Sequence, residues 1–178
     1  MLNLREATEH DAAAIAKLHA ESWRSAYRGM LSDEYLDNRV YLERATLWQR
    51  RFSEQVEKPF FAILAEIEVE LVGFACAFPD EHPSYGAYLD NLHVMPQRTG
   101  QGIGRRLLAA VAERLVTDER NGGLYLWVIE QNAKARRFYC KAGGLEVGCD
   151  TLSMPDGSRV TEVRCYWPSP ARLLSTDK

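Results

Sequence analysis

The segment of this sequence most suited to chemistry is a glycine-rich turn. Gly100, Gly102 and Gly104 follow an apolar stretch that ends at Pro96, and a helical pattern starts at Ile103. Glycines let backbone N–H groups turn toward a ligand without an obstructing Cβ, and a helix N-terminus adds unpaired donors and a partial positive charge. The turn therefore predicts a site for a phosphate or pyrophosphate. The nearby cationic side chains are Arg98, Arg105 and Arg106.

Two familiar phosphate-binding motifs do not fit this turn. A dinucleotide fingerprint needs a third glycine where Arg105 stands, and a Walker loop needs a lysine that the segment lacks. A tight turn with no ligand remains the alternative interpretation of the glycines.

The helices and strands that must position the turn are predicted from the periodicity of hydrophobic residues and from the glycines and prolines that interrupt it. Hydrophobic patterns predict strands over 3–7, 60–65, 70–78, 87–95, 124–129, 145–152 and 160–167. They predict helices that start after Thr8, Ser32, Gly102 and Asn132. The second of these helices is expected to run to about Phe52, and Pro79 is expected to end the third strand. This order predicts an α/β fold, a mixed and mostly antiparallel sheet of about seven strands with helices on both faces.

Composition and charge argue against several classes of function. The chain has 178 residues and a formal net charge of −3, so we expect one domain over 1–178 and no bulk nucleic-acid binding. No apolar run is long enough to cross a membrane, and the N-terminus does not look like a secretory signal. The four cysteines show no metal-ligand spacing. We therefore expect a cytoplasmic protein with reduced thiols and no metal.

Two motifs in order resemble those of the GNAT-type N-acetyltransferases. The first is Val94-x-Pro96-x-x-x-Gly100-x-Gly102-Ile103-Gly104-x-x-Leu107-Leu108, and the second is Leu126-x-Val128-x-x-x-Asn132-x-x-Ala135-x-x-Phe138-Tyr139-x-Lys141-x-Gly143. The resemblance covers about Leu2 to Trp167 and implies a GNAT-like fold with acetyl-coenzyme A as co-substrate. Two positions depart from the family pattern: Thr99 replaces Arg or Gln, and Gly144 replaces an aromatic residue.

The resemblance implies roles for these residues. Backbone N–H groups of the turn would hold the pyrophosphate, and the strand would pair with the amide-bearing arm of the cofactor and polarise the thioester carbonyl near Val94. Asn132 would contact the cofactor, although an ordinary helix N-cap is equally open. Tyr139 would contact the cofactor and protonate the leaving thiolate as a general acid. The implied cofactor-binding residues of the turn and strand are Leu92, His93, Val94, Arg98, Thr99, Gly100, Gln101, Gly102, Ile103, Gly104 and Arg105.

The acceptor amine must lose a proton before it attacks, and the candidate bases are Asp90, His93 and Glu130. We prefer Asp90. Strand alternation places Asp90 and Leu92 on one face and His93 on the other, an assignment that a local bulge would alter. Trp23 and Tyr27, one helical turn apart, are candidates for the acceptor pocket.

The first hypothesis is therefore direct acetyl transfer to a primary amine of a small molecule or peptide. Cys140 has no evident His partner, which disfavours a covalent route. The alternatives are a coenzyme-A-binding sensor without turnover and a phosphate-binding domain of another fold. The exposed edge of the hairpin at Val160–Trp167 is a candidate homodimer contact.

Overall fold

A seven-stranded sheet forms the centre of the molecule in the computed structural model, which describes residues 1–120 and 122–174. Its spatial order is β1-β2-β3-β4-β5-β7-β6. Every neighbouring pair is antiparallel except β4 and β5, so the predicted mixed, mostly antiparallel sheet is confirmed. The strands are β1 (Leu2–Glu6), β2 (Phe61–Ile67), β3 (Glu70–His82), β4 (Gly86–Val94), β5 (Leu124–Ile129), β6 (Leu145–Ser153) and β7 (Arg159–Trp167).

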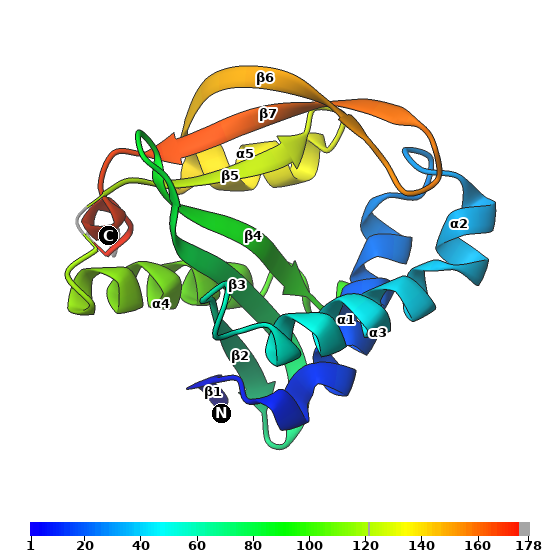
Figure 1. Cartoon of the computed structure of the whole chain (residues 1–178), viewed down its shortest axis with the longest axis horizontal. Helices are drawn as coiled ribbons and strands as arrows, with labels where there is room; N and C mark the ends of the chain where they lie inside the picture. Colours follow the sequence, from blue (N-terminus) through cyan, green and yellow to red (C-terminus); the bar gives the residue numbers. More distant parts are fainter. Residues whose placement is uncertain (121, 175–178) are drawn as a thin grey trace.

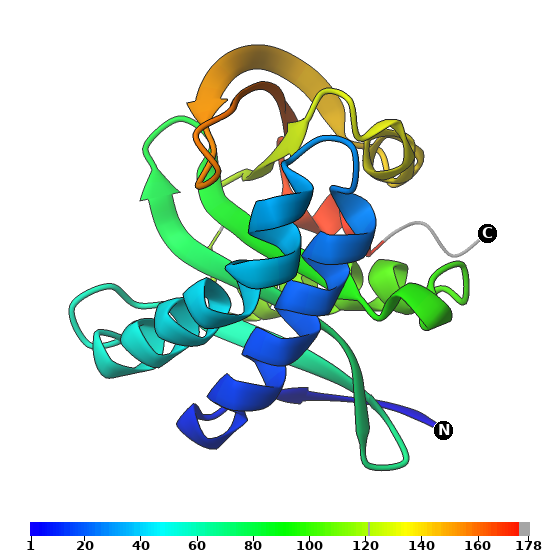
Figure 2. The same cartoon turned by 90° about the vertical axis from the view of Figure 1, so that its right-hand side faces the viewer.

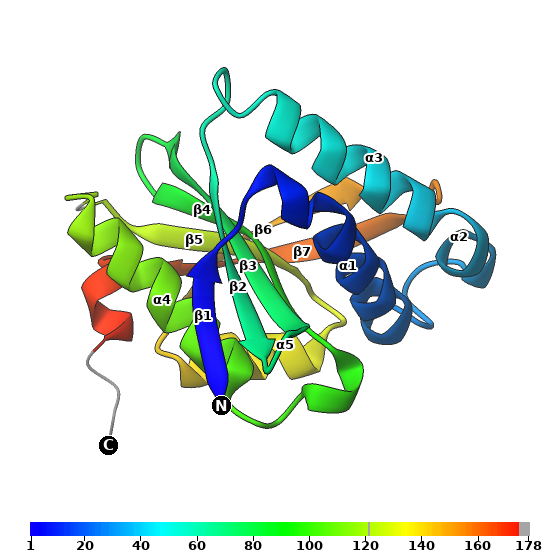
Figure 3. The ribbon, with the colours of Figure 1, turned by 90° about the horizontal axis from the view of Figure 1, so that it is seen from below.

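Helices cover both faces of the sheet, as expected. Figure 2 shows α1 and α3 side by side on one face, and Figure 3 shows α4 across the sheet from them. The helices are α1 (Ala12–Ala26), α2 (Asp33–Asn38), α3 (Val40–Ser53), α4 (Ile103–Thr117) and α5 (Ala133–Lys141). Short 3-10 turns are η1 (Glu9–Asp11), η2 (Pro96–Arg98) and η3 (Pro170–Leu173). No helix in the described part of the chain is long and apolar enough to cross a membrane.

Strand β3 separates two apolar layers. Phe74 and Phe78 pack toward α1 and α3, where Trp48 is fully buried, whereas Ala75 and Ala77 pack toward α4. A strand buried on both faces reads as a continuous apolar run, which explains the composition of β3. The sheet is thereby held rigidly between the two helical layers.

Two predicted boundaries were wrong. The single helix expected after Ser32 is two helices, because the chain bends at Arg39 between α2 and α3. The bend lets Tyr35 and Val40 enter one buried cluster beside β5, and packing overrides the helical periodicity. Pro79 does not end β3, which continues to His82 through an irregular register opposite β4, where the missing N–H of a proline is tolerated.

Strands β4 and β5 diverge soon after they meet. They pair only at Ala87 with Leu124 and at Tyr88 with Tyr125. Beyond Tyr88, the two strands separate, as Figure 1 shows. The parallel pair therefore opens into a wedge whose facing backbone edges are not joined to each other.

A bulge in β4 corrects the predicted strand faces. Asn91 pairs with Cys76 and Leu89 pairs with Ala77, so Asp90 is the extra residue. Asp90 and Asn91 both bond to Arg51 of α3. Asp90 therefore shares the α1–α3 face with His93, whereas Leu92 packs toward α4, and the expected sharing of one face by Asp90 and Leu92 is wrong.

Candidate active site

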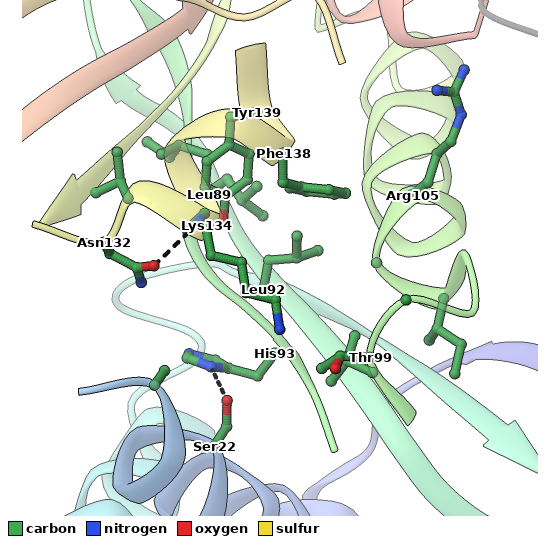
Figure 4. A pocket seen from close by; sticks show the side chains of 18 of the residues that line it. Ser22, Leu89, Leu92, His93, Thr99, Arg105, Asn132, Lys134, Phe138 and Tyr139 are labelled. Carbon is green, nitrogen blue, oxygen red and sulfur yellow. Dashed lines mark hydrogen bonds between the residues drawn. The ribbon is translucent and has the colours of Figure 1, made fainter. Parts of the chain in front are cut away.

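A cavity of about 370 Å³ occupies the wedge between β4 and β5. Its walls also include the start of α4, the first turns of α5 and the end of α1, as Figure 4 shows from close by. The lining residues are Ser22, Ala26, Tyr27, Leu89, Asp90, Leu92, His93, Val94, Arg98, Thr99, Gly100, Gly102, Ile103, Gly104, Arg105, Leu126, Trp127, Val128, Asn132, Lys134, Ala135, Phe138 and Tyr139. The structure thus brings together nearly all the predicted site residues; Gln101 and Glu130 are not among the lining residues.

The glycine turn is open toward the cavity. Gly100 and Gly102 have φ angles of +81° and +80°, a conformation that favours glycine, and an added Cβ at either position would meet no atom within 4 Å. The first helical bond of α4 runs from the Arg106 N–H to the Gly102 carbonyl at 3.1 Å. Within the described residues, the amides of 100–104 bond to no backbone carbonyl. The bend therefore presents several free donors at a helix N-terminus, as an anion site requires.

The backbone amides just before the turn are less available to an anion than predicted. The amide of Arg98 donates to Met95 O at 2.8 Å and that of Thr99 to Pro96 O at 3.5 Å, so both belong to η2. The Arg98 side chain lies 3.3 Å from Glu70 Oε2 in an ion pair. The main-chain donors for an anion are accordingly those after Thr99, a narrower set than the sequence suggested.

Lys134 is a lining residue that the sequence analysis missed. Its side chain extends from α5 into the same space as Tyr139 and Leu92 (Figure 4). The only available signal was its place inside the second motif, between Asn132 and Ala135. A lysine there adds positive charge at the cavity wall, where it complements an anionic ligand.

His93 is held as a neutral side chain. Its Nδ1 forms a 2.9 Å hydrogen bond with Ser22 Oγ, drawn in Figure 4, and its ring lies 4.6 Å from that of His19. Burial, with the added field of Arg44, lowers the pKa of His93 to about 3. The ring is therefore neutral at neutral pH, and its Nδ1 is already engaged by Ser22. Ser22 was not predicted as a site residue.

Tyr139 and Asn132 lie on α5 at the cavity. The Tyr139 ring packs edge-on against Phe138 at 5.1 Å, and burial raises the pKa of its phenol above the usual value. The phenol therefore stays protonated at neutral pH. Asn132 Oδ1 accepts a hydrogen bond from the Ala135 amide at 3.1 Å, which makes it the N-cap of α5. Its contact with a cofactor stays a prediction.

Asp90 lines the cavity as an ion-paired carboxylate. Arg51 binds Asp90 and also donates to Asn91 Oδ1 at 2.8 Å. Glu130, the other acidic candidate, is exposed.

The predicted acceptor-pocket residues differ in their positions. Tyr27 lines the cavity, and burial raises the pKa of its phenol to about 12. Trp23 packs behind it at a ring distance of 5.0 Å. Trp127 from β5 lines the cavity on another wall and was missed, because it sits within an almost entirely apolar strand.

Trp167 takes the place of the aromatic side chain that the family pattern has at the position of Gly144. A Cβ at 144 would lie 2.3 Å from Cys165 Sγ and 2.8 Å from the Trp167 ring. The indole donates to Ala142 O at 2.9 Å and packs 6.2 Å from the Tyr139 ring. Packing under the second motif is therefore supplied by β7. No group of three or more His, Cys, Asp or Glu side chains suited to a metal ion occurs in the described residues.

Comparisons with known proteins agree with this geometry. The model of the acetyltransferase (GNAT) family matches residues 14–143. An uncharacterized N-acetyltransferase, YuaI of Bacillus subtilis, is 31% identical over 175 residues, covering 97% of this chain and 96% of its own length. Rv2775 of Mycobacterium tuberculosis, described as a probable N-acetyltransferase, is 28% identical and covers 79% of this chain and 78% of its own.

Solved structures share the fold. The PaiA N-acetyltransferase of Thermoplasma acidophilum, in complex with coenzyme A, superposes with a TM-score of 0.69 at 20% identity, covering 91% of this chain and 98% of its own. YncA of Salmonella typhimurium, solved with acetyl-coenzyme A, has a TM-score of 0.67 at 15% identity and covers 94% of each chain.

Proposed function

The chain belongs to the acetyltransferase (GNAT) family, and we propose that it moves the acetyl group of acetyl-coenzyme A directly onto a primary amine. It is an N-acetyltransferase by family, with acetyl-coenzyme A as co-substrate. The residue roles that follow are our proposal, and the acceptor is a small-molecule or peptide amine.

The glycine bend fits a pyrophosphate. Side chains leave the space at Gly100 and Gly102 open, and the neighbouring amides carry no backbone partner among the described residues. We assign the amides of 100–104 to the pyrophosphate, with Lys134 adding charge. The unpaired edge of β4 from Leu92 to Val94 would bond to the amide-bearing arm as a further strand would.

Two groups act on the reacting atoms. A backbone N–H near Val94 stabilises negative charge on the thioester oxygen. Tyr139 donates its phenolic hydrogen to the departing sulfur. Because a thiol has a pKa of about 8–9 and burial raises that of the phenol, the phenol first acts as a hydrogen-bond donor. It transfers the proton only as charge on the sulfur grows.

Asp90 is our proposed acceptor of the amine's proton, directly or through a water. It lies in the cavity wall on the α1–α3 face, beside Tyr27 and Ser22 in the same lining. The cavity holds amine and thioester next to each other, which lowers the entropic part of the barrier. Cys140 is exposed and is not among the lining residues, so we propose no acyl-cysteine step.

The observation that carries this proposal is the open bend beside the β4–β5 wedge, with Tyr139 facing the same cavity. The test is a thiol-release assay with acetyl-coenzyme A and a broad panel of primary amines. We expect stoichiometric release of coenzyme A and N-acetylated product with a subset of amines. Tight binding of coenzyme A without release across the panel would contradict the proposal. Location in the cytoplasm and dimer formation stay predictions.

A further inference from the structure

A nearly buried cation, Arg44, is not itself among the cavity-lining residues but lies within electrostatic range of two of them, Tyr27 and His93. Arg44 projects from α3, and its side chain is only 11% exposed. Its Nε is shielded from solvent and has no hydrogen-bond partner within the described residues. Burying a charged guanidinium with an unused donor is unfavourable unless a partner or a ligand compensates for it.

Neighbouring carboxylates attract Arg44 through space without forming a hydrogen bond to it among the described residues. Glu43 Oε2 lies 3.7 Å from Arg44 Nη2, which is too long for a hydrogen bond. That carboxylate already accepts from the Tyr35 hydroxyl at 2.8 Å and from Arg39 at 3.2 Å. Asp90, a further acid within range of the field of Arg44, is paired with Arg51. Arg44 therefore retains its capacity to bind an anion.

The surroundings hold the guanidinium one aromatic ring away from the cavity wall. Arg44 stacks on Trp23 at 4.3 Å, and Trp23 packs against Tyr27, which lines the cavity. Its field also reaches His93 on the adjoining wall, where it adds to the effect of burial. A rigid, desolvated cation at this place gives specificity for a charged ligand.

Given the acetyl transfer proposed above, we infer that the acceptor is a primary amine that also carries a carboxylate, and that the Arg44 guanidinium binds this carboxylate. The planar guanidinium can donate two parallel hydrogen bonds to a carboxylate, which fixes the orientation of the acceptor. A purely cationic amine would instead meet Arg44 as a like charge. Arg44 is thus a specificity-determining residue and takes no part in the bond changes.

A second guanidinium offers the competing assignment. Arg164 of β7 lies between the rings of Tyr85 and Trp127, at 4.2 and 4.3 Å, and its Nε is also buried without a partner in the described residues. Glu162 on the same strand already lies within its field. We assign the carboxylate to Arg44 because Glu43, its ion-pair partner, also binds Tyr35 and Arg39, and Asp90 is paired with Arg51.

The experiment uses amino acids, each matched with its carboxamide and its decarboxylated amine. The values of kcat/KM are measured by thiol release for the wild type, Arg44→Gln and Arg164→Gln. Loss of a charge-assisted hydrogen bond predicts a preference of roughly tenfold to hundredfold for the carboxylate forms. Arg44→Gln should abolish this preference and retain activity on the carboxamides, and Arg44→Lys should keep part of it.

Controls separate binding from folding. Arg50→Gln removes the same charge from α3 at a side chain that is 62% exposed, and it should leave the preference unchanged. Arg44→Met should melt at the wild-type temperature or above it, because the unliganded guanidinium is poorly compensated. A lower melting temperature together with an unchanged preference would mark Arg44 as structural and overturn the inference.

Calorimetry of the same compounds with the coenzyme-A-loaded protein distinguishes the two proposals. Arg44-dependent binding of carboxylate-bearing amines without any thiol release would refute the proposed acetyl transfer but support the anion site at Arg44. Turnover of amines that lack a carboxylate, with equal or higher kcat/KM in the wild type, would refute the anion site alone. Loss of the preference in Arg164→Gln but not in Arg44→Gln would refute the assignment to Arg44.

Discussion

Burial keeps the Tyr139 phenol protonated, so that it can donate a proton. The ring lies among Phe138, Trp167 and the cavity wall, and burial raises the phenol pKa, so that the hydroxyl is a donor throughout the neutral range. The same residue contributes packing and, in our proposal, chemistry. Its hydroxyl and its ring can therefore be separated by a substitution that keeps the ring.

Tyr139→Phe removes the hydroxyl and leaves the packing. Because general acid catalysis contributes about 10²–10⁴-fold, kcat should fall by roughly that factor. The dissociation constant of coenzyme A, measured by calorimetry, should change little. Full turnover in this variant would exclude Tyr139 as the acid.

His93 should make stability depend on pH. Its pKa is about 3 in the folded chain and 6.5 without the fold. Between these values the unfolded chain binds a proton that the folded chain does not, so the free energy of unfolding falls as pH falls below 6.5. The contribution of His93 to this slope approaches about 1.4 kcal/mol per pH unit. Urea unfolding between pH 5 and pH 8, roughly the range in which histidine titrates, measures this dependence.

The matched variants for this experiment are His93→Gln and His10→Gln. His93→Gln should show a shallower dependence on pH, because the buried imidazole is gone. His10 is exposed in η1, and its variant should keep the wild-type slope. Equal slopes in all three proteins would refute the buried neutral state of His93.

At the scale of elements, the close approach of Gly144 to β7 fixes α5 and its Tyr139. An added Cβ would overlap Cys165 and Trp167, so Gly144→Ala should destabilise the protein by about 1–3 kcal/mol. Gly148→Ala in β6 is the matched control, since a Cβ there meets no atom within 4 Å. Urea unfolding compares the two. Equal stability would show that β7 does not pack tightly beneath α5.

The helices and strands were largely predictable from the positions of glycine and proline, but the contacts between them were not. Gly100 and Gly102, with Pro96 before them, mark the turn between strand and helix in any context. The bulge at Asp90 leaves no such mark, because an extra residue appears only when β3 and β4 pair. The Arg51–Asp90 pair joins positions far apart in sequence, and neither residue type indicates its partner. The same holds for the hydrogen bond between Ser22 and His93.

At the scale of the whole molecule, topology creates the site. β4 and β5 are parallel neighbours joined through α4, so the glycine turn lies at the open end of the wedge (Figure 1). The cavity wall also includes Ser22 and Ala26 of α1 and the adjoining Tyr27, which come from the first part of the chain. The edge strands of the sheet are β1 and β6, whereas β7 is internal. The predicted dimer contact of the β6–β7 hairpin therefore moves from Val160–Trp167 to Leu145–Ser153.

The central claim is that main-chain amides in the bend at 100–104 bind the pyrophosphate of coenzyme A. Titration calorimetry of coenzyme A and of pantetheine, which lacks the pyrophosphate and the adenosine 3′-phosphate, tests it in the wild type and in Gly102→Glu. Two charge-assisted hydrogen bonds predict at least roughly 100-fold tighter binding of coenzyme A by the wild type. In Gly102→Glu this advantage should vanish while pantetheine binding persists. An undiminished advantage in the variant would contradict the account.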